Sequence, residues 1–277
     1  MNYSSRFFLY APLGLFLSLA LGVGIHWWVV ASAFSDRLAA WNGHEIVPGV
    51  TMRYASRSIS GFPFSLDTVF QDVSLRIETP RGATEWHSEH FAMHALTYGR
   101  AETIFEAAGR QELRWTGNDG RGRSLTFAVG SLHASAIKDA GGLARFDLDL
   151  VGLGSKPLVA KRLQFHIRNN NRNDKFDLAL MADDVGASRD FCRILNTRLR
   201  SGSLVGTVSH AQAFSSLRAG EQEWTAAIAN WRAAGGRFET ADLPPRSGLQ
   251  LMLLQVPADR LFVVAEFLDF LCGAPRY

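Results

Sequence analysis

The segment Ala140–Leu150, AGGLARFDLDL, combines a glycine turn with strict alternation of apolar and charged side chains. The apolar members are Phe146, Leu148 and Leu150, and the charged members are Arg145, Asp147 and Asp149. Because successive side chains of a β-strand point to opposite faces, the segment predicts a strand with one apolar and one charged face. Such strands belong to antiparallel sheets that are covered on one side and face water on the other.

The same alternation recurs from Val50 to Asp184, with turn residues between the runs. The further alternating residues are Val50, Met52 and Tyr54; Val73, Leu75 and Ile77; Phe91, Met93 and Ala95; Leu125, Phe127 and Val129; Leu163, Phe165 and Ile167; and Phe176, Leu178 and Leu180. Consecutive runs of this kind predict antiparallel hairpins, and the lack of a long helix between them argues against a parallel α/β fold. We therefore predict a mostly β protein with a few helices (α+β): a large, curved antiparallel sheet packed with two or three helices.

The segment Arg57–Leu66, RSISGFPFSL, places aromatic rings on both sides of Pro63. Because proline cannot donate to a strand ladder, we expect Pro63 on an edge strand, at the corner of a first hairpin. Period-two spacing then predicts that Phe62, Phe64 and Leu66 point to the buried face. The predicted apolar face of the sheet comprises Phe62, Phe64, Leu66, Phe146, Leu148 and Leu150.

The N-terminal segment Phe7–Ser32 contains no Asp, Glu, Lys or Arg. A helix of about 20 apolar residues crosses a bilayer, and Trp27 and Trp28 stand near its far end, where such rings favour the membrane interface. Arg6 precedes the segment and no acidic residue does, which favours a cytoplasmic N-terminus. We expect a single-pass protein of the inner membrane: residues 1–32 form a cytoplasmic stub and transmembrane helix, and residues 33–277 form a periplasmic β-rich domain.

Two alternatives to this anchor remain open. The triplet Ala31–Ala33, ASA, is a fair signal-peptidase site, although the apolar run is longer than the 7–15 residues or so of a signal sequence. A buried helix of a soluble core is the other alternative.

Helical spacing appears only outside the alternating region. A short helix is expected at Ala33–Trp41, ended by Asn42 and Gly43. Glu221–Ala234 carries an apolar stripe at helical spacing and stops at a glycine pair. Pro257–Leu271 is apolar and begins with proline, but it is too short to cross a bilayer. We expect this last helix to pack on the sheet, with a position on the membrane surface as the alternative.

The motifs Gly61–Phe64, GFPF, and Trp231–Gly236, WRAAGG, together with the N-terminal membrane segment, resemble a bacterial envelope family known as domain of unknown function 2125. The resemblance extends from about Phe7 to Leu243. The family implies no activity, substrate or catalytic residue. Its general shape is similar to larger AsmA-type envelope proteins, which implies, by analogy of fold alone, a curved sheet whose apolar concave face accommodates lipid chains.

Composition and motifs favour few kinds of chemistry. The net charge of +3 is weak for a nucleic-acid binder, so no nucleic-acid partner is expected. His87, Glu89, His90 and His94 do not match a His-Glu-x-x-His zinc motif, and we interpret the histidines as solvated strand residues rather than metal ligands. No phosphate-binding loop or nucleophile elbow occurs, so we expect neither an enzyme nor a cofactor.

Other polar features have alternative interpretations. Cys192 and Cys272 would form a disulfide outside the cytoplasm or remain buried thiols. A basic cluster would face solvent or approach anionic lipid headgroups, and comprises Lys161, Arg162, Arg168, Arg172 and Lys175. Asp147 and Asp149 share a strand face, where surface charge explains them without acid/base catalysis.

Two hypotheses of function agree with these patterns. In the first, the apolar sheet face binds a lipid or another hydrophobic component of the envelope. In the second, the core is fully self-packed, and the protein is a structural or assembly partner that pairs through its strand edges.

Overall fold

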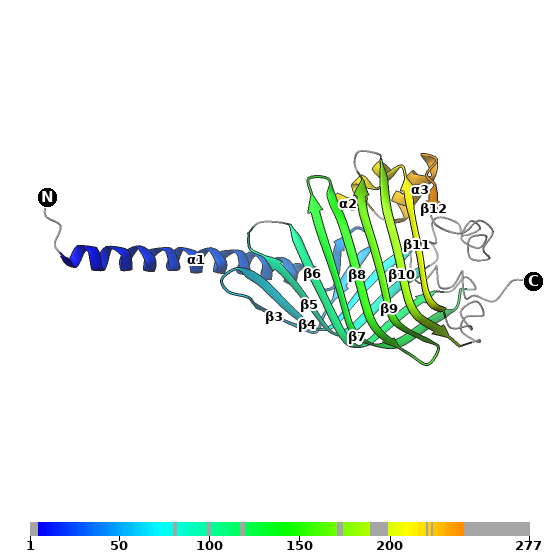
Figure 1. Ribbon diagram of the computed structural model, residues 1–277, viewed down its shortest axis with the longest axis horizontal. Helices are drawn as coiled ribbons and strands as arrows, with labels where there is room; N and C mark the ends of the chain where they lie inside the picture. Colours follow the sequence, from blue (N-terminus) through cyan, green and yellow to red (C-terminus); the bar gives the residue numbers. More distant parts are fainter. Residues whose placement is uncertain are drawn as a thin grey trace, which may run out of the picture.

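A computed structural model shows a long N-terminal helix leading into one large, curved antiparallel sheet (Figure 1). The structure describes residues 5–79, 82–98, 101–116, 120–170, 174–188, 199–219, 221–222 and 224–240. The predicted helix Pro257–Leu271 and both cysteines, Cys192 and Cys272, lie outside these residues.

The described helices and strands are arranged in a simple order along the chain. The helices are α1 (Ser5–Trp41), the short 3-10 helix η1 (Ala211–Phe214), α2 (Ser215–Ala219) and α3 (Trp224–Ala233). The strands are β1 (His44–Val47), β2 (Val50–Arg53), β3 (Ser56–Ser60), β4 (Ser65–Thr79), β5 (Gly82–Leu96), β6 (Glu102–Thr116), β7 (Gly122–Asp139), β8 (Gly142–Gly154), β9 (Leu158–Asn170), β10 (Lys175–Ala187), β11 (Leu199–Ser209) and β12 (Phe238–Thr240).

The strands form a 12-stranded sheet in which neighbours along the chain are neighbours in space. The order is β1-β2-β4-β5-β6-β7-β8-β9-β10-β11-β12, and β3 pairs with β4 beside β2. All of these pairings are antiparallel. The predicted fold class is therefore confirmed.

Helix α1 continues without a break through the predicted membrane segment into the predicted short helix Ala33–Trp41. The expectation of two separate helices was wrong, because no glycine or proline lies between Ser32 and Trp41 to interrupt the helix. Gly43, with a φ of 83°, follows the helix end as predicted. The part Tyr10–Trp41 is long and apolar enough to cross a membrane, as a membrane anchor or a signal sequence would be.

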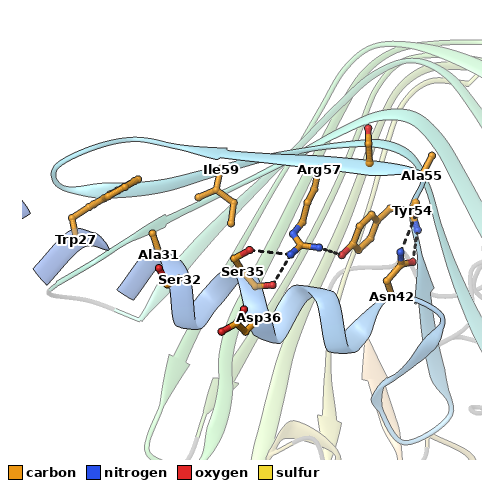
Figure 2. A pocket seen from close by; sticks show the side chains of 11 residues that line it. Trp27, Ala31, Ser32, Ser35, Asp36, Asn42, Tyr54, Ala55, Arg57 and Ile59 are labelled. Atoms are coloured by element: carbon orange, nitrogen blue, oxygen red, sulfur yellow. Dashed lines mark hydrogen bonds between the residues drawn. The ribbon is translucent and has the colours of Figure 1, made fainter. Parts of the chain in front are cut away.

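One face of the sheet, here called the inner face, carries a continuous layer of apolar side chains. Pairing aligns Phe70 with Phe91, Phe91 with Ala107, Ala107 with Leu132 and Leu132 with Leu150. The last turns of α1 lie on the inner side of the curved sheet (Figure 2). Leu38 of these turns is fully buried and belongs to one cluster with Phe70.

The other end of the inner face is covered by η1 and α3. Trp231 is fully buried there with Val208 and Phe214, and its indole Nε1 donates to the Ser209 carbonyl at 2.6 Å. A Cβ on Gly236 would lie 2.0 Å from Trp231 Nε1, so a glycine is required where the chain passes the ring. The Trp231–Gly236 motif is thus explained by packing.

A row of interrupted pairings, here called the crease, crosses the sheet from β4 to β10. It passes through Asp72, Glu89, Gly109, Gly130, Gly152, Lys161 and Asp184. Asp72, Gly109, Gly152 and Asp184 all have positive φ angles, between 51° and 79°. The pairing registers of β6 with β5 and with β7 also shift at the crease, as at a β-bulge, and such irregularities bend strands and strengthen their twist. The crease therefore accounts for the curvature of the sheet.

Across the crease, inward-facing residues are three apart instead of two. Phe70 is followed by Val73, Leu150 by Leu153, and each pair belongs to one buried cluster. A regular strand would have turned the second residue of each pair to the outer face. The extra residue that β4 and β8 each carry at the crease, where the backbone turns, thus keeps the apolar layer on a single face.

The prediction that Phe62 and Phe64 point to the buried face was wrong. β3 ends at Ser60 and β4 begins at Ser65, so both rings lie on the connecting turn and are largely exposed. Gly61 closes this turn, because its carbonyl accepts hydrogen bonds from the amides of Phe64 and Ser65. Leu66, the first inward residue of β4, is buried as predicted.

Substitution of Gly152 by alanine tests the crease. Residues with a side chain disfavour a φ of +69° by about 1–2 kcal/mol, so G152A should lower the free energy of unfolding by about that amount. The matched control is Gly154→Ala, at a glycine with ordinary φ and open space around its Cβ, which should be neutral or slightly stabilising. Denaturant titration of the full chain in micelles, followed by tryptophan fluorescence, measures both; equal stabilities would contradict the assignment.

Candidate functional site

The middle of the inner face is an apolar surface of the sheet that lies between the parts covered by the described helices. It comprises Phe146, Leu148, Phe165, Leu178 and Leu180 on β8, β9 and β10, where Leu148 pairs with Phe165 and Phe165 with Leu180. These side chains are half-buried, and among the described residues they pack into none of the buried clusters. The predicted apolar residues Phe146 and Leu148 belong to this middle, and Leu150 is buried beside it.

A groove of about 710 Å³ lies between α1 and β3, at the opposite end of the inner face from α3 (Figure 2). Helix α1 contributes Trp27, Ser35 and Asp36, and the chain around β3 contributes Tyr54 and Arg57. Most of these groups are polar. The groove could hold a polar group by hydrogen bonding. It lies beside the part of α1 where the uncharged apolar segment ends.

Arg57 joins the two walls of this groove. Its guanidinium donates to the Ser35 carbonyl at 2.7 Å and to the Ser35 hydroxyl at 2.9 Å. It also donates to the Tyr54 hydroxyl, which in turn donates to the Leu38 carbonyl at 2.9 Å. These hydrogen bonds hold α1 against the sheet, so the main role of Arg57 is structural.

The outer face carries alternating histidines and carboxylates. His94 Nδ1 donates to Asp67 Oδ1 at 2.8 Å, and its Nε2 lies 3.8 Å from Glu106 Oε2. On β9, His166 Nδ1 donates to Asp147 Oδ1 at 2.6 Å. The predicted surface role of Asp147 is thus supported by its contacts.

These contacts set the protonation of the carboxylates. The hydrogen bond from His94 holds the pKa of Asp67 below its usual value. Burial raises the pKa of Asp147, but the hydrogen bonds from His166 and Arg145 outweigh it, so that the net pKa is lowered. The guanidinium of Arg162 lowers the pKa of Asp149 through a bidentate hydrogen bond.

The histidines of the predicted strand do not converge. No group of three or more His, Cys, Asp or Glu side chains among the described residues is placed to hold a metal ion. The strand alternation predicted His87 on the face opposite His90 and His94. Instead, the crease at Glu89 turns Ser88 inward, and His87 Nε2 lies 3.9 Å from Asp72 Oδ1 on the outer face.

The predicted basic cluster is spread out. Lys161 lies at the crease and Arg168 near the other end of β9, while Lys175 begins β10. Arg162 is paired with Asp149, and Arg172 lies outside the described residues. The geometry therefore does not support a single site in which these residues together bind an anionic lipid headgroup.

The chain joins a long apolar helix to an open antiparallel sheet, and this sheet has one apolar and one charged face. The protein thus belongs to the class of β-sheet proteins with an N-terminal membrane-type segment. Within that class, the chain belongs to the family described as "Uncharacterized protein conserved in bacteria" (domain of unknown function 2125), whose model matches residues 27–263. No curated protein and no solved structure matches it. The family match begins at Trp27, so it includes the end of α1 that packs on the sheet.

Removing the Arg57 side chain tests its role at the groove. Arg57→Met should lower the free energy of unfolding by about 1.5–3 kcal/mol, because the hydrogen bonds from a charged group to the Ser35 carbonyl and hydroxyl and to the Tyr54 hydroxyl are lost. It should also speed hydrogen exchange in residues 31–41. Arg37→Met, at an exposed position of the same helix, is the control. The role is refuted if both variants exchange at the wild-type rate.

Acidification tests the outer-face pairs. Because the pKa of Asp147 is lower in the folded chain than in the unfolded one, its contribution is fully present above about pH 3.9 and is lost as the pH falls below that value. Asp147→Asn should be less stable than wild type at pH 7 and should lose less stability between pH 5 and pH 3. Urea midpoints across this range measure the effect.

His166→Gln is the companion variant, since it removes one donor but keeps the Asp147 carboxyl and Arg145. Its profile should fall between those of wild type and Asp147→Asn. Parallel profiles for all of them would show that the pair contributes nothing.

Proposed function

We propose that this is a membrane-anchored, extracytoplasmic binding protein of the bacterial envelope, without catalytic activity. Helix α1 serves as the single-pass anchor in the inner membrane, with its N-terminus in the cytoplasm, and the sheet lies in the periplasm. The middle of the inner face binds the acyl chain of a lipid or another hydrophobic envelope component.

An uncleaved α1 is supported by contacts on the N-terminal side of the potential cleavage triplet Ala31–Ala33. Trp27 Nε1 donates to the Ser65 carbonyl at 2.9 Å, and the Trp27 ring meets Phe62 edge-on at 5.6 Å. Ala31 itself is buried. Cleavage would remove side chains that pack on the sheet, which favours retention of the segment.

The observation that carries the binding proposal is the half-buried middle of the inner face. α1 packs at one end of this face, and η1 and α3 pack at the other. Acyl chains make no hydrogen bonds and gain from any apolar surface that excludes water, so a strip of Leu and Phe between covered ends suits them. The polar groove beside α1 would suit the headgroup end of such a ligand.

The alternative is a self-packed structural or assembly protein that engages an envelope protein partner. This alternative is supported by the open edge of the sheet, because β3 pairs with a strand on one side only in the described part of the chain.

Photo-crosslinking tests the binding proposal. Full-length protein is expressed in cells fed a diazirine-bearing fatty acid and irradiated in its membranes, and lipid adducts are mapped by mass spectrometry. Adducts should lie on β8, β9 and β10. Leu148→Gln should lower their yield about tenfold, which corresponds to about 1.4 kcal/mol of binding free energy.

The matched control is Val151→Gln, three residues along the same strand on the outer face, which should leave the yield unchanged. Adducts confined to α1 in every variant would refute lipid binding by the sheet and leave the assembly role. Crosslinks of the sheet to one discrete envelope protein would support that role.

A further inference from the structure

Four exposed apolar side chains gather on neighbouring turns at one end of the sheet. Phe62 and Phe64, on the turn between β3 and β4, are 61% and 55% exposed. Leu96 and Tyr98, where β5 ends, are 53% and 60% exposed. We call these residues the aromatic tip.

The two turns are held together as one unit. The amide and hydroxyl of Thr97 both donate to the Phe64 carbonyl at 3.1 Å, and the rings of Phe64 and Tyr98 meet edge-on at 5.9 Å. The amides of Phe64 and Ser65 are satisfied by the Gly61 carbonyl. The backbone amides of Phe64, Ser65 and Thr97 are therefore already paired, which lowers the cost of placing these turns in an apolar medium.

The aromatic tip lies beside the apolar part of α1. The hairpins run back along the helix toward its N-terminus (Figure 1), and Trp27 contacts both Phe62 and the Ser65 carbonyl. The first charged residue of α1 beyond Trp27 is Asp36, about 13 Å further along at 1.5 Å per residue. A bilayer that contains the uncharged run of α1 thus reaches the level of the tip.

The composition of the tip fits that position. No charged residue occurs between Ser58 and Leu66 or between Ala95 and Tyr98, and the next acid, Asp67, is paired with His94. Aromatic rings are favoured at the boundary between acyl chains and headgroups. Contiguous apolar patches exposed on a protein surface are often sites of contact with a membrane or another protein.

We propose that the aromatic tip is a second membrane contact, which inserts into the interface of the bilayer that α1 spans. The sheet is then held by the helix and the tip together, and the inner-face residues Leu66 and Ala95 lie next to the lipid. This inference rests on the proposed anchor, but it is independent of lipid binding by the middle of the inner face.

Site-specific photo-crosslinking in vesicles tests this contact. Benzoylphenylalanine is placed singly at Phe64 or Tyr98 in the full chain, reconstituted in phosphatidylethanolamine–phosphatidylglycerol vesicles. After irradiation, both positions should give phospholipid adducts at a yield within about threefold of that from Leu17, an exposed position of α1. Val159, an exposed apolar residue on β9, is the negative control and should give less than a tenth of that yield.

The controls separate the possible failures. Adducts at Leu17 but not at Phe64 or Tyr98 would overturn the tip while leaving the anchor intact. Absence of adducts at Leu17 would overturn both. Crosslinks from the tip to a second copy of the chain or to another protein, in place of phospholipid, would also overturn the proposal, because the tip would then be a protein interface.

Discussion

The rest of the structure depends on keeping one face of a long, strongly curved sheet apolar. A strand that takes up one extra residue presents its later side chains on the other face, unless the backbone turns at that residue. Here the pairings from β4 to β10 are interrupted along a common row. At that row the spacing of inward residues changes from two to three on β4 and β8, as at Leu150 and Leu153. Curvature and a single continuous apolar layer are thereby obtained together. The positive φ of Asp72, Gly109, Gly152 and Asp184 is the local cost of this arrangement.

Sequence patterns could predict the features that arise from local periodicity. Alternation identified the hairpins, the uncharged run identified α1, and the stripe that includes Ala227, Ile228 and Trp231 identified α3, whose buried side chains match it. The crease was missed because a three-residue step resembles irregular spacing in any single strand and becomes meaningful only when neighbouring strands share it. The positions of Phe62 and Phe64 were predicted wrongly for a related reason. Both residues lie in a turn, where period-two spacing does not indicate which face of a sheet a side chain points to. The Arg57 contact with Ser35 joins elements 22 residues apart, which no local pattern reveals.

The two faces of the sheet differ in how their side chains are stabilised. Inward residues are stabilised by removal of apolar area from water, which is non-directional and tolerates a ligand in place of a protein cover. Outward histidines and carboxylates are stabilised by directional pairs across strands, as between His166 and Asp147, and each pair also links neighbouring strands. Asp147, Asp149 and His94, which were weighed as candidates for acid/base or metal chemistry, are thus accounted for by cross-strand pairing. The opposite face, where the apolar side chains of the half-buried middle make no directional pairs, is the face for which we propose ligand binding.

The junction of α1 with the sheet decides how these faces are presented to a membrane. A flexible linker after a transmembrane helix would let the sheet take any orientation, but α1 runs unbroken into the inner face, where Leu38 is buried and Arg57 bonds to Ser35. Trp27 adds a contact nearer the apolar run, so helix and sheet touch at both ends of the groove. A rigid junction of this kind fixes the orientation of the strands relative to the axis of the helix. In the proposed orientation, with α1 as a membrane anchor, the hairpin turns beside Trp27 face the bilayer, and the inner face begins where the lipid ends. For a protein that takes up hydrophobic molecules, that placement shortens the distance over which an acyl chain would be exposed to water.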